Sequence, residues 1–419
     1  MKNKMKIINH IYCLTYTAVL LLTSCSDSEV KNSVHESPAE FMTIPNVTLP
    51  NLRAVGEKLY MSWVDTVSNK REAQLKIAEI SDNVLQPPLT LASSDEWFVN
   101  WADYPTIAVN GDYILAHFLQ NVEADHRMAY DIKFGVHDMT KPVRTFERLN
   151  TDETATEHGF VSMLALTDTS FFITWLDGRM MQSGQDHSHN HNHHGRHGMN
   201  VRAAEINLKG QISNEIVLDQ MACTCCQTTA ALTASGPVVL YRDCTIDNIR
   251  DIVITRKIGE QWTEPRPIHL DGWKINGCPV NGPKVDAYQD DLAVAWFTGA
   301  NGEPKVNVSF SADAGATFSE PISVSQGVPI GRVDLVLLNA EQALVSWMAS
   351  TGTETFLYAQ KIGTDGMKGR PVKIDTVSAD RKTGFPQMEV VNDRVYFAWT
   401  IPKGTASDVK ITHMAVDQF

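Results

Sequence analysis

The chain has few basic residues relative to acidic ones. Lys plus Arg number 36 against 49 Asp plus Glu, which gives a formal net charge of −13 at pH 7. A chain this acidic repels phosphate, so the composition argues against a nucleic-acid partner. Long apolar runs are also scarce: Ile11–Leu22 is too short to cross a bilayer comfortably, which excludes a multispanning membrane protein. The remaining composition, 43% hydrophobic and 20% charged, is that of an ordinary folded protein.

A sustained helical period of apolar residues is missing too, so helices are not expected to form the core. Short runs rich in Val, Ile, Leu and Tyr recur instead, and they are bounded by Gly, Asn, Asp and Pro. Runs of this kind are typical of β-strands. The sequence therefore predicts an all-β fold.

Seven of these runs end on an aromatic residue, and these aromatics are Trp63, Phe118, Trp175, Tyr241, Trp296, Trp347 and Trp399. Successive aromatics are 55, 57, 66, 55, 51 and 52 residues apart. A regular period of about 40–60 residues with several short strands per unit indicates a β-propeller. Seven repeats predict seven blades, with six as the alternative. The last repeat stops after its third strand, so we expect Phe41–Leu49 to supply the missing outer strand.

The N-terminal region differs from the rest of the chain. Three lysines precede the apolar stretch, and Leu-Thr-Ser-Cys follows it, ending at Cys25. This arrangement resembles the lipobox of bacterial lipoproteins, which implies cleavage of a signal peptide at residues 1–24 and attachment of lipid, such as palmitate, to Cys25. Residues 25–40 are polar and read as a flexible tether, so 41–419 form the folded domain. The alternative is an ordinary cleaved signal with an incidental cysteine.

Two consequences follow from this prediction. Removal of the three lysines takes the formal charge from −13 to −16. The mature chain would be anchored to a membrane by lipid in the bacterial cell envelope, outside the cytoplasm and facing the periplasm or the cell surface, where disulfides persist.

The segment Ser311–Phe318 reads Ser-Ala-Asp-Ala-Gly-Ala-Thr-Phe. It matches the Asp box, S-x-D-x-G-x-T-[FW], of sialidase-like propellers. We expect a turn between the third and fourth strands of a blade, in which Asp313 bonds turn backbone, Gly315 adopts an unusual φ and Phe318 packs on the blade. A degenerate copy lies at 255–262. This motif is structural, so it supports the fold and not an activity.

The repeat assigns each loop to one of the two faces of the ring. Loops that lead into first strands share a face with loops between second and third strands, and the Asp-box turn lies on the other. The first group contains residues 97–101, 157–158, 223–226 and 277–281, and the second contains 177–179, 242–244 and 250–251. The segments with the most reactive side chains therefore share one face, as expected for a binding site carried by loops.

One loop on that face is rich in histidine. Residues 186–198 read DHSHNHNHHGRHG, with histidines at His187, His189, His191, His193, His194 and His197. Imidazoles at this density bind Zn, Cu or Ni. The alternative is a low-complexity insert that captures metal weakly without using it.

Five cysteines follow the predicted anchor, and these are Cys223, Cys225, Cys226, Cys244 and Cys278. The repeat places them in neighbouring loops. Disulfides are the favoured prediction, and the odd number leaves one thiol over. The alternative is a thiolate site for Cu or Zn as cofactor. Adjacent Cys225 and Cys226 point in opposite directions on a strand, so a shared metal would need a turn between them.

Several arginines and aspartates near these cysteines are candidates for ligand binding. Guanidinium groups hold carboxylates bidentately, including those of sialic or uronic acids. The candidates are Arg53, Asp177, Arg179, Arg242, Asp243, Arg250 and Asp251. The alternative is that these are solvated ion pairs that contribute little.

The Asp box and the repeat together resemble the sialidase, or BNR-repeat, superfamily over essentially all of 41–419. The sequences CTCC at 223–226, IRDI at 249–252 and DGWKINGCPVNGP at 271–283, with the Arg242-Asp243 pair, also resemble a bacterial group of sialidase-like lipoproteins. Sialidases use an arginine triad, an acid/base Asp and a Tyr activated by Glu. Their Arg-Ile-Pro motif is absent here, with Arg53 as the candidate for its place, and no Tyr–Glu pair is evident. Sialidases also have six blades, so the resemblance does not establish an activity.

We therefore expect a lipid-anchored propeller that binds a ligand, in the first place an anionic glycan. The alternatives are an exo-acting glycoside hydrolase of the sialidase type or a lyase, and a Cu- or Zn-binding protein that uses the cysteines and the histidine-rich loop. No catalytic residue can be assigned from the sequence.

Overall fold

The computed structural model describes residues 41–66, 72–124, 128–141, 145–181, 198–324 and 326–419. The predicted signal peptide, Cys25, the tether and residues 186–197 of the predicted histidine-rich loop 186–198 lie outside these ranges. Within the described part, no helix is both long and apolar enough to cross a membrane.

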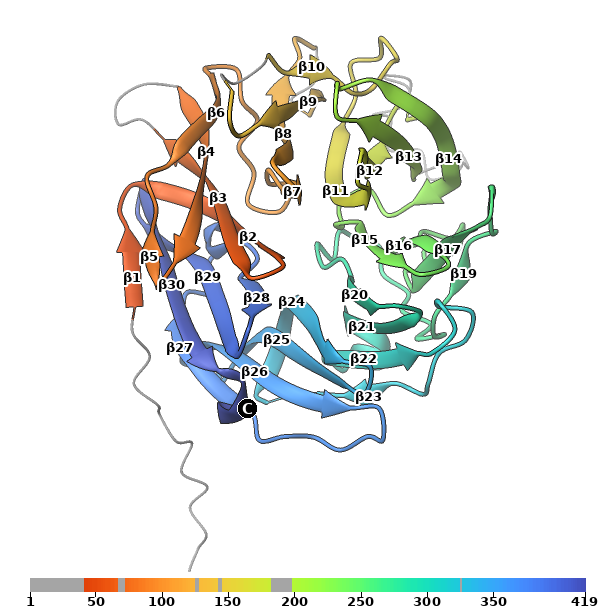
Figure 1. Ribbon diagram of the computed structural model, residues 1–419. Coiled ribbons are helices and arrows are strands. Elements are labelled where there is room, and N and C mark those ends of the chain that lie inside the picture. Colours follow the sequence, from red (N-terminus) through yellow and green to blue (C-terminus); the bar gives the residue numbers. More distant parts are fainter. Residues whose placement is uncertain (1–40, 67–71, 125–127, 142–144, 182–197, 325) are drawn as a thin grey trace, which may run out of the picture. The chain divides into compact units, whose positions relative to one another are not determined.

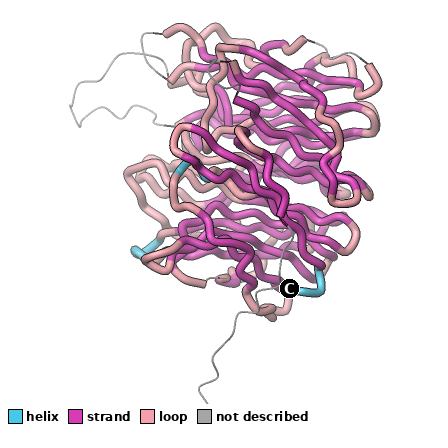
Figure 2. Tube along the Cα trace, turned by 90° about the vertical axis from the view of Figure 1, so that its left-hand side faces the viewer, coloured by secondary structure: helices cyan, strands magenta, loops and turns pink. Residues whose placement is uncertain are grey.

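The described strands form seven antiparallel sheets arranged around a ring (Figure 1). The all-β and seven-blade predictions are confirmed, and the six-blade alternative is excluded. Seen from the side in Figure 2, loops lie on the two faces of this ring of strands. The loops that lead into first strands and those between second and third strands define one face, which we call the top face.

The first three blades take up the chain as far as Ala222. Blade 1 contains β2 (Val47–Val55), β3 (Lys58–Thr66), β4 (Ala73–Ser81) and β5 (Val84–Leu85), with β6 (Leu89–Ser94) also paired to β4. Blade 2 contains β7 (Ile107–Asn110), β8 (Tyr113–Asn121), β9 (Tyr130–Asp138) and β10 (Glu147–Arg148). Blade 3 contains β11 (His158–Thr167), β12 (Ser170–Asp177), β13 (Met199–Asn207) and β14 (Ile212–Ala222).

The remaining blades follow in order around the ring. Blade 4 contains β15 (Thr229–Thr233), β16 (Gly236–Arg242), β17 (Ile252–Ile258), β18 (Gln261–Trp262) and β19 (Arg266–Pro267). Blade 5 contains β20 (Lys284–Tyr288), β21 (Asp291–Thr298), β22 (Lys305–Ser311) and β23 (Ile322–Ser323). Blade 6 contains β24 (Val328–Asn339), β25 (Gln342–Ser350), β26 (Thr355–Gly363) and β27 (Val372–Val377). Blade 7 contains β28 (Gln387–Val391), β29 (Arg394–Lys403), β30 (Ala406–Ala415) and β1 (Phe41–Ile44). Short 3-10 helices occur at Ala300–Gly302, Arg381–Thr383 and Val416–Gln418.

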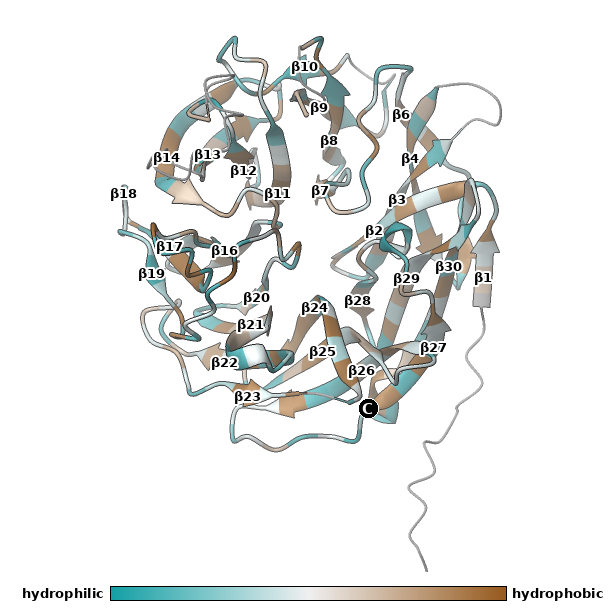
Figure 3. Cartoon of the chain, turned by 180° about the vertical axis from the view of Figure 1, so that it is seen from behind, coloured by the Kyte–Doolittle hydropathy of each residue, from teal (hydrophilic) through white to brown (hydrophobic). Residues whose placement is uncertain are grey.

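The repeated aromatic residue lies on the second strand of every blade and is buried. Trp347 of blade 6, for example, packs in one cluster with Val306 and Val308 of blade 5. Each aromatic side chain removes about 150–250 Å² from water, so the repeat marks the apolar contacts between blades. The second strands are buried on both faces: in β25, Val345 and Trp347 face blade 5, and Leu344 and Met348 face blade 7. Figure 3 shows the hydrophobic residues along the strands.

The ring closes by pairing the two ends of the domain. Strand β1 pairs with β30 as the outer strand of blade 7, from Phe41 opposite Thr412 to Ile44 opposite Val409. The prediction of closure by an N-terminal strand is confirmed, but the strand is shorter than expected. Asn46 has a φ of 59° and turns the chain, so the residues from Val47 onward form the first strand of blade 1 instead.

The Asp-box turn joins β22 to β23, the third and fourth strands of blade 5, as predicted. The Asp313 carboxylate accepts hydrogen bonds from the backbone N–H of Thr317 at 2.8 Å and from its hydroxyl at 2.7 Å. Gly315 has a φ of 77°, and Phe318 packs against the cluster between blades 4 and 5. The three predicted roles are therefore confirmed.

Polar side chains in the first strands, or just before them, join neighbouring blades. At six junctions, a side-chain oxygen of one blade accepts a hydrogen bond from a backbone N–H of the next. These junction bonds are Asn51 to Ile107 at 3.2 Å, Asp103 to Phe160 at 2.7 Å, Ser162 to Ala230 at 3.1 Å, Gln227 to Gly282 at 3.0 Å, Asp286 to Leu337 at 2.8 Å and Asp334 to Met388 at 2.8 Å. At the seventh, the Asn51 side chain donates to the side chain of Gln387 at 2.8 Å.

Three of these first strands contain an irregularity near the top face. Leu49, Phe160 and Arg332 have φ values of 55°, 54° and 54°, in a region that residues with large side chains rarely adopt. The pairing register shifts at each of these places. Each lies two residues before a junction residue, so the bulge sets the direction in which that residue points.

Candidate functional site

The top face brings together most of the side chains singled out from the sequence. Cys223, Cys225 and Cys226 lie in the loop before β15, and Cys278 lies in the loop before β20. The side-chain oxygen of Gln227, next to Cys226, accepts a hydrogen bond from the backbone N–H of Gly282 at 3.0 Å, so the two loops meet. Cysteines 52 to 55 residues apart in the chain thus form one group because neighbouring blades place their loops side by side.

The loop before β15 folds three sulfur atoms together. The Sγ of Cys223 lies 3.7 Å from that of Cys225 and 3.5 Å from that of Cys226. A turn at Thr224 and Cys225 supplies the change of direction that a shared site requires. Cys223 and Cys226 are buried and Cys225 is half-buried. All five described cysteines are free thiols in the structure, and the disulfides expected from the sequence remain a prediction.

Charged groups surround the sulfur atoms. The guanidinium of Arg250 donates to the Sγ of Cys223 at 3.0 Å. Hydrogen bonds from Cys225 and Cys226 hold the pKa of Cys223 well below its usual value, and Arg250 acts in the same direction. A hydrogen bond from Cys225 lowers the pKa of the exposed Cys278 to about 6. Burial, together with the nearby Cys278, raises the pKa of Glu157 to about 7.

Cys244 lies apart from the three clustered sulfurs. It is buried after β16, and its Sγ is 4.0 Å from the carbonyl oxygen of Thr245. Burial raises its pKa, so it is an unreactive thiol by comparison. The neighbouring Asp243 accepts a hydrogen bond from the N–H of Cys244 at 2.7 Å, and burial raises the pKa of Asp243 to about 6.

Arg242 is a buried structural connector between blades 4 and 5. Its guanidinium donates to the backbone carbonyls of Asn281 at 2.9 Å, Arg250 at 2.6 Å and Phe297 at 2.7 Å, and it lies over the ring of Trp273. Only 1% of the residue is exposed. These bonds use the donors that a carboxylate ligand would need.

Asp251 has a similar structural role. Its two carboxylate oxygens accept hydrogen bonds from the backbone N–H groups of Gly272 and Trp273, each at 3.0 Å. In both predicted Arg-Asp pairs, 242–243 and 250–251, the arginine and the aspartate therefore bond different partners within the protein.

Asp177 and Arg179, at the end of β12, form a bidentate ion pair with both nitrogen–oxygen distances at 2.7 Å. The Asp177 carboxylate also accepts from the indole N–H of Trp175 at 3.0 Å. The buried His158 approaches Asp152 at 3.2 Å and Asp177 at 3.7 Å. Because Arg179 and Trp175 occupy the oxygens of Asp177, this group reads as a structural network and not as an open metal site.

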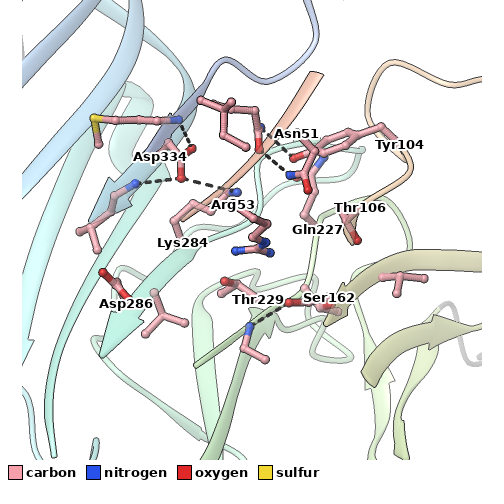
Figure 4. A pocket seen from close by; sticks show the side chains of 18 of the residues that line it. Asn51, Arg53, Tyr104, Thr106, Ser162, Gln227, Thr229, Lys284, Asp286 and Asp334 are labelled. Atoms are coloured by element: carbon pink, nitrogen blue, oxygen red, sulfur yellow. Dashed lines mark hydrogen bonds and ion pairs between the residues drawn. The ribbon is translucent and has the colours of Figure 1, made fainter. Parts of the chain in front are cut away.

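A polar cavity of about 100 Å³ lies on the axis of the ring, lined by the first strands of the blades. Figure 4 shows polar side chains converging on it, with Arg53 reaching toward the middle of the group. The guanidinium of Arg53 donates to the carbonyl of Ile107 at 3.1 Å and lies 3.9 Å from the carboxylate of Glu389. Lys284 lies 3.6 Å from the carboxylate of Asp334.

The carboxyl groups beside this axial cavity have unusual pKa values. Burial raises the pKa of Glu389 to about 8, although Arg53 acts in the opposite direction. Burial raises the pKa of Asp103 to about 7 against hydrogen bonds from Phe160 and Tyr130. We did not predict these residues. Their signal in the sequence is a charged residue inside an apolar first-strand run, as in Met388-Glu389-Val390.

A larger groove lies on the top face beside blades 1 and 7. It has a volume of about 320 Å³, and its lining residues are Thr48, Leu49, Thr66, Val99, Asn100, Trp101, Lys382, Thr405 and Ser407. Trp101 is fixed from two neighbours, because Phe385 stacks on it at 6.0 Å and the guanidinium of Arg332 lies 5.1 Å from its ring. We call this the Trp101 groove. Of the residues that line it, the sequence pointed to the loop 97–101 but not to Lys382.

Comparisons with known proteins support the fold but identify no family. No family model matches the chain, and no curated protein matches it. Among solved structures, an ulvan lyase of a new polysaccharide lyase family, bound to -[GlcA(1-4)Rha3S]-, is similar with a TM-score of 0.56 and 10% identity over 90% of this chain and 96% of the other. The endosialidase of phage phi92 is similar with a TM-score of 0.50 and 11% identity over 90% of this chain and 69% of the other. At such identities the similarity shows a shared architecture: the fold is that of sialidase and polysaccharide lyase β-propellers.

Proposed function

We propose that this propeller binds an anionic glycan in the Trp101 groove on its top face. The observation that carries the proposal is the lining of the groove, which combines one ordered aromatic ring, one lysine and several hydroxyl and amide groups. An aromatic face packs against the apolar side of a sugar ring, and neighbouring polar groups select its hydroxyls. The volume, about 320 Å³, is within the range of small-ligand sites.

The positively charged side chains of the top face favour the Trp101 groove over the loops that contain the cysteines. Arg242 and Arg179 already bond other groups of the protein, and Arg250 bonds a sulfur. Lys382 lines the groove and donates to the carbonyl of Gly404 at 2.9 Å from an exposed position. A backbone carbonyl is a weaker partner than a carboxylate, so an acidic sugar can recruit this ammonium. The two structural neighbours that act on acidic polysaccharides have the same architecture.

The test is binding of sialylated, uronic and sulfated oligosaccharides, measured by calorimetry with a glycan array as the first screen. Trp101→Ala should weaken binding at least 10-fold, and Lys382→Ala should weaken binding of acidic glycans more than of neutral ones. The matched control is Lys141→Ala, because Lys141 is an exposed lysine in the loop after β9 and hence on the other face. Equal affinity in the wild type and Trp101→Ala would refute the proposed site.

Cleavage of the glycan, by hydrolysis or by β-elimination, is the second candidate. Carboxyl groups whose pKa lies near neutrality suit proton transfer, and burial gives Asp103, Glu157 and Glu389 values of about 7, 7 and 8. Release of sialic acid from sialosides tests hydrolysis, and the absorbance of unsaturated uronic products tests elimination. Activity that survives in Glu389→Gln would remove Glu389 from the mechanism.

We also propose that the chain is a lipoprotein anchored through Cys25 in the bacterial cell envelope. The support is the order of basic residues, apolar stretch and Leu-Thr-Ser-Cys in the sequence. Metabolic labelling with a palmitate analogue should mark the wild type but not Cys25→Ser. Label retained by Cys25→Ser would contradict the anchor.

A further inference from the structure

Three thiols lie close together in the loop before β15, whereas a disulfide would join only two of them. The Sγ separations are 3.7 Å for Cys223 and Cys225 and 3.5 Å for Cys223 and Cys226. All three sulfurs lie within 4.8 Å of one another. A disulfide requires an S–S distance of about 2.05 Å and joins only two of them.

These separations suit a shared metal ion. A metal–sulfur distance of about 2.3 Å places two sulfurs about 3.8 Å apart in a tetrahedral site and about 4.0 Å apart in a trigonal one. The observed separations are slightly shorter, so the sulfurs need to move apart by only a few tenths of an ångström. The turn at Thr224 and Cys225 already points the three side chains to one place.

A cation lies against one of the three sulfurs. The guanidinium of Arg250 donates a hydrogen bond to the Sγ of Cys223 at 3.0 Å. Cations beside a thiol stabilise its thiolate, which is the form that binds metal. The guanidinium of Arg250 also offsets part of the net charge of −2 that three thiolates and one monovalent ion carry.

We propose that Cys223, Cys225 and Cys226 bind one Cu(I) ion as a three-thiolate site on the top face. Soft thiolates select Cu(I) among the common ions, whereas a closed Zn(II) site needs four ligands. On binding, each thiol gives its proton to solvent and forms one sulfur–copper bond, with no change in oxidation state. Cys278, exposed in the loop of the next blade, is the fourth ligand that zinc would recruit. The site is independent of the Trp101 groove.

The experiment uses the full chain, reduced under anaerobic conditions, with the six histidines of 187–197 replaced by alanine to remove imidazole ligands. Cu(I) is supplied in complex with a chromophoric chelator whose colour is lost on transfer. We expect one copper per chain, and X-ray absorption should show a first shell of three sulfurs. Copper that stays with the chelator, or a shell of nitrogen and oxygen, would overturn the proposal.

Single serine variants locate the site. Cys223→Ser, Cys225→Ser and Cys226→Ser should each weaken Cu(I) binding about 100-fold or more, beyond the 10–100-fold typical of an outer-shell change. Arg250→Ala, which removes such an outer partner, should fall within that smaller range. The matched control is Cys244→Ser, because Cys244 is buried in the same blade and lies outside the cluster. Equal loss in Cys244→Ser would overturn the assignment.

Two further measurements exclude misfolding as the cause of lost binding and distinguish a copper site from a zinc site. In the wild type, bound copper should block alkylation of the three clustered thiols, detected by mass spectrometry of peptides; unchanged alkylation would contradict the proposal. Cys278→Ser should retain Cu(I) binding. Preferential binding of Zn²⁺ that is lost in Cys278→Ser would replace the copper assignment with a four-thiolate zinc site.

Discussion

Arg242 connects blades 4 and 5 from inside the protein, through carbonyls of both blades and the ring of Trp273. Arg242→Met fills the space but leaves these buried carbonyls without a donor, so we expect the free energy of unfolding to fall by about 3 kcal/mol. Urea denaturation followed by tryptophan fluorescence measures the change. The control is Arg148→Met, because Arg148 is an exposed arginine 3.7 Å from Asp131.

This measurement also decides between two roles for Arg242. A protein with unchanged stability and lost glycan affinity would assign the arginine to the ligand, against its contacts in the structure. The sequence could not separate these roles because the carbonyls that Arg242 bonds belong to two loops and a strand. One of these, at Phe297, is 55 residues away along the chain.

The free energy of unfolding should depend on pH because of Asp103. Burial raises its pKa from 3.8 to about 7, so between these values the folded chain keeps a proton that the unfolded chain has lost. The contribution of Asp103 to the free energy of unfolding therefore falls as pH rises from about 4 to 7 and then stays level. The wild type should lose stability relative to Asp103→Asn across that window, as measured by urea denaturation at several pH values.

The difference between the wild type and Asp103→Asn reports on Asp103 alone, because the two proteins share all other acidic groups. Asp168→Asn, a change at an exposed turn between β11 and β12, is the control and should follow the wild type at every pH. Wild-type and Asp103→Asn curves that run parallel from pH 4 to 7 would show that Asp103 has an ordinary pKa.

At the level of elements, the Asp-box turn of blade 5 depends on one carboxylate. Asp313 accepts hydrogen bonds from Ser311 and from two groups of Thr317. Asp313→Ala removes them, and because the turn is partly open to water we expect a loss of about 1–3 kcal/mol in the free energy of unfolding. Thermal unfolding of the variant beside Asp168→Ala measures it. Equal midpoints in the two variants would show that the carboxylate adds nothing to the turn.

The strands themselves were predictable because their signal is local. Trp296 and Trp347 end apolar runs at a regular spacing, and Gly315 fills a place in a recognisable turn. The junction bonds were not predictable, because their donors belong to the next blade. Asn51, Ser162 and Gln227 are different residue types that share only a position beside the axis, so no pattern in the chain marks them.

At the level of the whole molecule, the period also predicted which loops meet. It placed Cys226 and Cys278 in the loops of adjacent blades, and the structure brings their loops into contact through Gln227 and Gly282. The period could not predict the axial cavity or the Trp101 groove. Lys284 and Lys382 are unremarkable in sequence: Lys284 reaches the axial cavity only when the first strands surround one axis, and Lys382 reaches the Trp101 groove only when the loops of neighbouring blades meet.

Closure of the ring should make β1 essential for full stability. Strand β1 completes blade 7, and Met42 and Ile44 pack against the apolar cluster shared by blades 7 and 1. A chain that begins at residue 45 loses this strand and exposes the edge of β30, whereas a chain that begins at residue 41 keeps it. We expect the loss to be about 2–3 kcal/mol, which lowers the melting temperature by about 2–4 °C in a domain of this size.

Calorimetry of the two truncated chains is the measurement, because they differ only in the four residues of β1. The shorter chain should also aggregate more readily, since an unpaired outer strand offers hydrogen-bonding groups to another molecule. A peptide of residues 41–44 is too short to restore the blade, so the deficit should persist when it is added. If both chains melt at the same temperature, the ring is held by the contacts between blades, and the strand borrowed from the N-terminal side contributes no closure.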